Sequence, residues 1–366
     1  MQLASSIMPE TAPGANAAPA TSATGSEPGA LATGRRRCYL IAAIDGNHNG
    51  DFDQARRLID AARQAGADAV KFQKRTVEWA AVRQVLDQRC PRYGSLGPTY
   101  REALRKLEFT PEQLLALSGH AGPALGFIVA PYDVPALEAL RGLPFSAVQI
   151  DAPNVVHVPL LEALRQIDLP IYACTGGCSA KEVRTLVRIL QDKPLTLLFS
   201  SHAVQPDAML VDLRTITLLR HFGRPVGYSG HAPDVRMGCV ARVLGAEDIE
   251  KRLTLSRALE GPHHASSLTP VEFAELVEAI RAIDRELEDP VPRCRHLAEI
   301  DLLQEERPSL VASRPIPKGT VITREMLALK PPMRGLGPHL IDYVVGKKAL
   351  YDLDCDDFIT FGVIST

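Results

Sequence analysis

The chain has 366 residues, of which 46% are hydrophobic and 23% are charged, and its formal net charge is −2. This composition is typical of a soluble protein, and the length suggests about two domains. The balanced charge, without a basic stripe, argues against a protein that binds nucleic acid or a membrane surface. No run of about 18 apolar residues is present, so no transmembrane helix is expected. Seven cysteines without a zinc-type spacing favour the reducing cytoplasm.

The first segment, residues 1–36, is rich in Ala, Pro, Ser, Thr and Gly. It has neither the basic start nor the apolar stretch of a secretory signal. Such a composition buries too little apolar surface to offset the entropy lost on ordering, so we expect a disordered tail.

From residue 38 onward, short apolar segments alternate with amphipathic helical patterns. In residues 53–66, for example, Ala55, Leu58, Ile59 and Ala62 fall on one helical face. The segments are apolar on both sides, as in a parallel sheet that is covered by helices. The predicted strands are residues 38–44, 68–73, 126–131, 146–151, 170–176, 194–201, 224–230 and 247–253.

Eight β-α units in about 250 residues predict an α/β fold of the (β/α)8 TIM-barrel type over residues 37–288. The alternative is a doubly wound open sheet, but the early Gly-rich turn of a dinucleotide-binding sheet is missing. A final helix over 269–289 closes the barrel. We expect a linker at 289–307 and a small β-rich domain at 308–366, where Pro and Gly turns separate short strands.

A TIM barrel carries its site at the C-terminal ends of its strands. The "GNHNG" stretch that follows the first strand is first of all a turn and a helix cap, with Asp51 or Asp53 at the cap. Cys174, at the end of the fifth strand, is more typical of a small buried residue than of a reactive thiol. The polar residues that these strand ends offer are Asp45, Asn47, His48, Lys71, Gln73, Arg75, Tyr132, Asp133, Gln149, Asp151, Asn154, Thr175, Ser200, Ser201, His202, Ser229, His231, Arg252, His263 and His264.

Several motifs together resemble the sialic acid (N-acetylneuraminate) synthase family, over about residues 38–366. They are "GNHNGDFDQARRLIDAARQAGADAVKFQK", "SLGPTYREALRKLEFTPEQL", "GYSGH", "IEKRLTLSRALEGPHHASSLTPVEF" and the C-terminal "IPKGTVITREMLALKPP...VVGKKAL". The resemblance implies a TIM barrel followed by a small SAF (antifreeze-like) domain. It also implies condensation of phosphoenolpyruvate with an amino-sugar, a divalent metal, and a domain-swapped homodimer whose SAF domain covers the partner's site.

The resemblance also shows departures at the positions that carry this chemistry. The family holds its metal with two histidines; His231 matches the first, whereas Arg252 stands at the second. A guanidinium is always protonated and has no lone pair to donate to a metal. The other departures are Ala43 and Asn154 in place of glutamates, Asp45 in place of a glycine, Gln149 in place of a lysine, His263 in place of an aspartate, Ala130, Ala152 and Cys174 in place of phosphate-pocket hydroxyls, and Pro331 in place of an SAF-domain arginine, for which Arg334 is a possible stand-in.

Three functions follow as alternatives. The first is a rebuilt, metal-independent enzyme of specialised sugar or antibiotic-type metabolism, which forms or breaks carbon–carbon bonds in a sugar-like small molecule. The second is the family's metal-dependent condensation with phosphoenolpyruvate. The third is a non-catalytic relative in which Arg252 pairs with a carboxylate such as Glu250 or Asp151 and the histidines are satisfied by their neighbours.

For the first function we predict a catalytic set and a substrate-binding set, with no cofactor. Lys71 is expected to bind an anion, with a Schiff-base lysine as the alternative. His231 is a metal ligand only if a Mn²⁺ or Mg²⁺ ion is retained. The catalytic set is Asp45, His231, Arg252, Asp151 and His263, and the substrate-binding set is Lys71, Gln73, Asn154, Ser229, His202 and Arg334.

Overall fold

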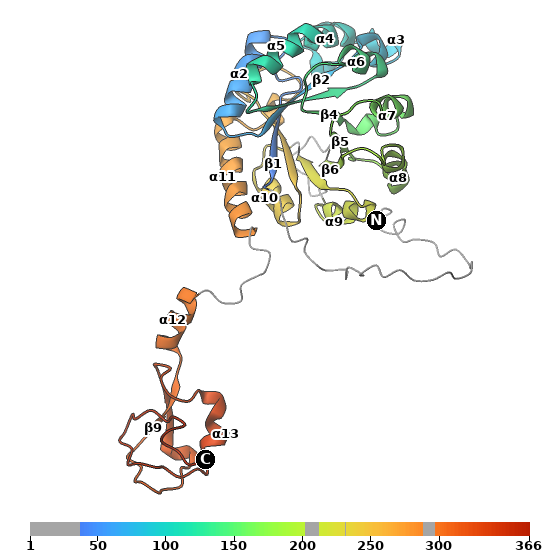
Figure 1. Cartoon of the computed structure of the whole chain (residues 1–366). Coiled ribbons are helices and arrows are strands. Elements are labelled where there is room, and N and C mark those ends of the chain that lie inside the picture. Colours follow the sequence, from blue (N-terminus) through green and yellow to red (C-terminus); the bar gives the residue numbers. More distant parts are fainter. Residues whose placement is uncertain (1–36, 202–211, 231, 288–296) are drawn as a thin grey trace, which may run out of the picture. The chain divides into compact units, whose positions relative to one another are not determined.

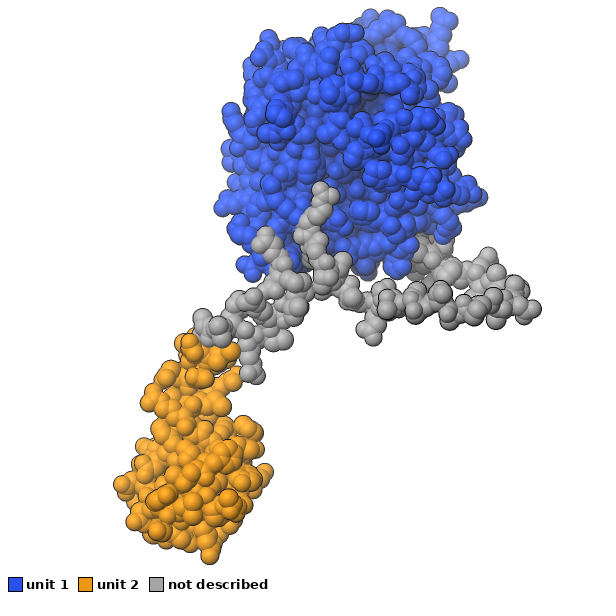
Figure 2. Space-filling model, viewed as in Figure 1, with its two compact units in different colours: residues 1–290 blue, residues 291–366 orange. Residues whose placement is uncertain are grey.

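The structure is a computed structural model of the full chain, and it describes residues 37–201, 212–230, 232–287 and 297–366. It divides into two compact units, residues 1–290 and residues 291–366 (Figure 2). None of the helices in these described ranges combines the length and apolar character needed to cross a bilayer. The tail predicted at residues 1–36 lies outside the described residues.

Eight parallel strands of the first unit form a closed barrel, in which each strand pairs with the next and β8 pairs with β1 (Figure 1). The predicted TIM barrel is confirmed, and the open-sheet alternative is wrong. Every predicted strand is present, with ends that differ by at most a few residues. The strands are β1 (Tyr39–Ala43), β2 (Ala69–Lys74), β3 (Gly126–Pro131), β4 (Ala147–Ile150), β5 (Ile171–Cys174), β6 (Leu195–Ser201), β7 (Val226–Gly230) and β8 (Asp248–Arg252).

Helices surround the barrel (Figure 1). The first of them, α2 (Phe52–Gln64), begins at Asp51, whose carboxylate accepts a hydrogen bond from the backbone N–H of Gln54. Its buried residues are the four that the sequence pattern placed on one face. The remaining helices of this unit are α3 (Arg83–Leu86), α4 (Tyr100–Leu107), α5 (Pro111–Ala121), α6 (Val134–Ala139), α7 (Val158–Leu164), α8 (Ala180–Ile189), α9 (Thr215–Leu219), α10 (Arg236–Val243) and α11 (Pro270–Leu287).

Alternation along each strand decides which residues reach the inside of the barrel. On β2, Val70 and Phe72 belong to the large apolar core between strands and helices. Ala69 belongs to a separate interior cluster with Ile41 and Ile128. Lys71 and Gln73 share the parity of Ala69, so they point into the barrel one and two layers nearer to the C-terminal end.

His48, in the turn after β1, is part of the packing. Its ring lies 4.4 Å from the ring of Phe109, centroid to centroid, and its Nδ1 accepts a hydrogen bond from the N–H of Gly50 at 3.0 Å. Burial lowers the pKa of His48 from 6.5 to about 3. The imidazole is therefore neutral at neutral pH, and its role is to pack in the interior of the protein.

Because the pKa of His48 is lower in the folded chain than in the unfolded chain, its contribution to stability is present above pH 6.5 and is lost as the pH falls. Between pH 6.5 and about pH 5 this loss is expected to reach about 2 kcal/mol of unfolding free energy. Urea titrations of His48→Gln should lack that slope, whereas His221→Gln, at an exposed histidine, should keep it. An unchanged slope in His48→Gln would contradict the assignment.

The second unit is small and mostly non-helical. Its strands β9 (Ser309–Ala312) and β10 (Leu327–Lys330) pair antiparallel around a core that includes Leu310, Ile322 and Ile359. A single turn of helix, α13 (Ile341–Val344), follows. The segment predicted as a linker, 289–307, includes a helix, α12 (Leu297–Glu306).

Candidate active site

A cavity of about 270 Å³ opens at the C-terminal ends of the barrel strands. Strand ends supply most of its wall, and the segment between β2 and α5 supplies the rest. The residues that line it are Asp45, Lys71, Gln73, Arg75, Arg92, Tyr93, Tyr100, Tyr132, Asp151, Ala152, Pro153, Cys174, Ser229, Glu250, Arg252 and His263.

Lys71 lies at the floor of this cavity, surrounded by three carboxylates. Its Nζ is 3.1 Å from Asp45 Oδ1, 3.4 Å from Glu250 Oε1 and 3.7 Å from Asp151 Oδ1. Burial alone would lower the pKa of Lys71, but the carboxylates outweigh burial and raise this pKa well above 10.5. The lysine therefore stays an ammonium ion, which argues against its acting as a Schiff-base nucleophile.

Glu250, on β8, is the carboxyl group with the most unusual surroundings. It is buried, and its Oε1 accepts a hydrogen bond from Ser229 Oγ at 2.7 Å. Its Oε2 has no hydrogen-bond partner among the described residues. Burial raises the pKa of Glu250, and Lys71 offsets only part of that effect. Glu250 can therefore hold or release a proton nearer to neutral pH than an ordinary carboxyl group.

Arg252 ends β8 and pairs with Asp45, with 3.4 Å between Nε and Oδ2. Arg252 thus pairs with a carboxylate, as the non-catalytic alternative expects, but the carboxylate is Asp45 and not Glu250 or Asp151, both of which contact Lys71. Asp45 has a φ of 46°, in the left-handed region where glycine is favoured and aspartate is tolerated. This conformation brings the Asp45 carboxylate between two cations.

Asp151, which follows β4, is a hydrogen-bond acceptor in the wall of the cavity. It accepts hydrogen bonds from Gln73 at 2.8 Å and from the Tyr132 hydroxyl at 2.6 Å. Burial by itself would raise the pKa of Asp151, but Lys71 and the hydrogen bonds from Tyr132 and Gln149 lower it below 3.8, so the group is a carboxylate at neutral pH. The Arg75 guanidinium lies 4.2 Å from the centroid of the Tyr132 ring and pairs with Glu108.

His263 lies at the rim, next to an arginine from the segment after β2. Its Nδ1 is 3.0 Å from an Arg92 nitrogen, and because arginine can only donate, the ring must accept there. Burial, followed by the charges of Arg252 and Arg92, lowers the pKa of His263 well below 6.5. The ring is therefore neutral and carries its hydrogen on Nε2.

The other predicted site residues lie elsewhere. Asn154, in the 3₁₀ turn after β4 (Ala152–Asn154), is buried and is not among the residues that line the cavity. Arg334 is exposed in the second unit and lies 3.6 Å from Glu305. His202 and His231 are outside the described residues.

Sequence reasoning missed part of this site. Glu250 was considered only as a partner of Arg252, although its two-residue spacing from Arg252 on β8 places both inside the barrel. Arg92, Tyr93 and Tyr100 carried no signal, because the irregular segment after β2 returns to the strand ends only through tertiary packing.

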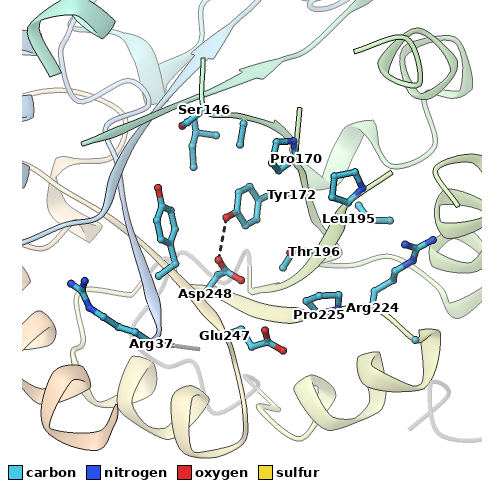
Figure 3. A pocket seen from close by; sticks show the side chains of 15 residues that line it. Arg37, Ser146, Pro170, Tyr172, Leu195, Thr196, Arg224, Pro225, Glu247 and Asp248 are labelled. Carbon is cyan, nitrogen blue, oxygen red and sulfur yellow. Dashed lines mark hydrogen bonds between the residues drawn. The ribbon is translucent and has the colours of Figure 1, made fainter. Parts of the chain in front are cut away.

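A second, larger cavity of about 490 Å³ is lined by residues from the N-terminal ends of the strands, among them Tyr39 and Asp248. Figure 3 shows the Tyr172 hydroxyl donating a hydrogen bond to Asp248 Oδ1, at 3.1 Å. This cavity is at the opposite end of the barrel from Arg252, so size alone does not mark the chemical site.

Within the described ranges, no three His, Cys, Asp or Glu side chains are grouped so that they could hold a metal ion. The three carboxylates of the floor surround the Lys71 ammonium, so a positive charge already lies among them.

Comparison with known protein families identifies both units of the chain. The model of the NeuB family matches residues 58–291, and the model of the SAF domain matches residues 307–362. The chain belongs to the NeuB family. The resemblance seen in the sequence is thereby confirmed, together with the SAF domain at the C-terminal end.

Two relatives match most of the length of this chain. N-acetylneuraminate-9-phosphate synthase of Homo sapiens is 33% identical over 344 residues, which are 91% of this chain and 94% of that protein. N,N'-diacetyllegionaminic acid synthase of Legionella pneumophila is 30% identical, over 86% of this chain and 91% of that protein. The structure of sialic acid synthetase from Leptospira borgpetersenii, in complex with citrate, has a TM-score of 0.65 and 26% identity, and covers 73% of this chain and 91% of that one.

Proposed function

We propose that this chain is a biosynthetic enzyme of the sialic acid synthase type whose site has been rebuilt to work without a metal. It forms or cleaves a carbon–carbon bond in a sugar-like carbonyl or carboxylate substrate. The observation that carries this proposal is the ion pair between Arg252 and Asp45, at the strand end where the family places a metal-binding histidine.

The donors that the described residues offer at this end of the barrel do not fit a resident divalent ion; His231, which the resemblance makes the first ligand, lies outside them. Mn²⁺ and Mg²⁺ need several oxygen or imidazole donors, and Arg252 offers none. Asp45 lies between Lys71 and Arg252, and both cations would repel an incoming metal. We therefore assign the electrostatic work of the site to these two side chains.

The charges of the site suit a reaction through an enolate. The carbon next to a carbonyl loses a proton, the enolate carbon attacks an aldehyde carbon, and the aldehyde oxygen takes up a proton; cleavage is the reverse. Arg252 can stabilise the negative oxygen with fixed charge. Glu250, with its raised pKa and its free oxygen, can move the proton.

Exchange of carbon-bound hydrogen tests this function directly. The full chain in D₂O with EDTA is incubated with pyruvate or with a 3-deoxy-2-keto sugar acid, and proton NMR follows the C3 hydrogens. We expect catalysed exchange, reduced about a hundredfold or more in Glu250→Gln. The matched control is Glu247→Gln. Glu247 precedes β8 and lines the cavity at the other end of the barrel, so this variant should retain exchange.

The parent chemistry is the second candidate, because the match extends over 94% of the human relative and the resemblance keeps Lys71 and Ser229 at family positions. It predicts no exchange with EDTA and phosphate release from phosphoenolpyruvate that depends on Mn²⁺. A chain that shows neither activity would support the non-catalytic alternative. The domain-swapped homodimer and the cytoplasmic location stay predictions.

A further inference from the structure

The floor of the candidate site holds two acceptor atoms that receive no hydrogen bond from a described residue. Asp45 Oδ1 and Glu250 Oε2 are buried and accept no hydrogen bond from any described residue, although Lys71 Nζ is 3.1 Å from the former. A buried polar atom that lacks a hydrogen bond is energetically unfavourable. A ligand that brings hydroxyl or amino hydrogens to this floor would supply the missing hydrogen bonds, whereas another anion would place acceptors against acceptors.

The middle of the cavity offers nothing to a phosphate group. Ala152 and Cys174 form an apolar wall together with Leu198. Ser229 already donates its hydroxyl hydrogen to Glu250, and the charge of Lys71 is balanced by its carboxylates. An anionic group is therefore poorly accommodated at the depth of Lys71.

The rim has the opposite character. In the ranges that the structure describes, no carboxylate lies within ion-pair distance of Arg92, whose only hydrogen bond goes to the neutral ring of His263. Arg252 makes a single contact with Asp45 through Nε. A guanidinium has five N–H donors, so both side chains have donors to spare for a carboxylate.

From this polarity we infer that the site takes a polyhydroxylated carboxylate, bound with its hydroxyl groups on Asp45 and Glu250 and its carboxylate on Arg92 and Arg252. This inference names the substrate class of the proposed function and rests on that function. The volume of about 270 Å³ suits one monosaccharide-sized molecule. The tyrosine rings of Tyr93 and Tyr100, 5.3 Å apart, form the side wall.

Calorimetry on the metal-free full chain can test this orientation with three probes: gluconate, the neutral glucitol, and inorganic phosphate. We expect gluconate to bind at least about tenfold more tightly than glucitol, because only gluconate reaches the rim arginines. Phosphate should not compete with glucitol, because the floor that holds the hydroxyl groups does not accept an anion. Arg92→Gln should weaken gluconate about tenfold and leave glucitol unchanged, whereas Arg83→Gln, an exposed arginine of the same segment, should change neither.

Three results would overturn the inference: equal affinity for gluconate and glucitol, phosphate binding that competes with glucitol, or no binding of any polyol. The hydrogen-exchange assay separates this failure from that of the proposed function. Exchange without a preference for gluconate would reject only the orientation. Gluconate binding that depends on Arg92, without exchange on any keto acid, would support the ligand class and reject the chemistry.

Discussion

Lys71→Met is expected to lower the unfolding free energy of the barrel by about 4 kcal/mol at pH 8, because it leaves three buried carboxylates without their shared cation. The loss should shrink as the pH falls towards 5. Without the ammonium, protonation of the clustered carboxyl groups removes their mutual repulsion, so acidification favours the folded state. Urea titration followed by circular dichroism measures both effects.

The matched control is Lys330→Met, in which the lost lysine is exposed and pairs with Asp356. Such a surface pair contributes little, so the change should stay below about 1 kcal/mol at either pH. A Lys71→Met chain that is as stable as the parent at pH 8, or that loses further stability on acidification, would contradict the description of the floor as a cluster held by one cation.

Arg252→His is expected to raise the affinity for Mn²⁺ by about a hundredfold. The substitution removes a fixed positive charge and adds an imidazole donor at the strand end where the family resemblance places the second metal-binding histidine. Titration of Mn²⁺ with detection of the free ion by electron paramagnetic resonance gives the dissociation constants of parent and variant.

Arg252→Gln separates the two causes, because it removes the charge without adding a good metal ligand. Its Mn²⁺ affinity should rise above that of the parent, because repulsion is removed, but should stay well below that of Arg252→His. If Arg252→Gln binds Mn²⁺ as tightly as Arg252→His, repulsion alone excludes the metal. If the parent itself binds as tightly as Arg252→His, Arg252 does not stand in for a ligand, and the rebuilt site is rejected.

The barrel could be predicted from the sequence because its signal is repeated. Each strand is short, apolar and followed by an amphipathic helix, so a shifted end at one strand, such as β5, does not change the topology. The C-terminal ends of those strands then gave Asp45, Lys71 and Arg252 a common location. Periodicity and the strand-end rule were sufficient for both results.

The pairing within the site could not be predicted in the same way. Arg252 contacts Asp45 because Asp45 adopts a left-handed backbone conformation that turns its carboxylate towards β8. Arg92 reaches His263 across 171 positions of sequence. Such contacts depend on tertiary packing and on side-chain length, which leave no periodic pattern in the sequence. The sequence therefore indicated which polar groups gather at the strand ends, but not which of them pair with one another.

The most direct measurement is a calorimetric titration of the full chain with phosphoenolpyruvate, with and without Mn²⁺. A floor of carboxylates around Lys71 and an arginine at the metal position predict that Mn²⁺ neither creates nor strengthens binding of this phosphate ester. Binding that appears or tightens at least tenfold only with Mn²⁺ would contradict the account and restore the parent chemistry to this barrel.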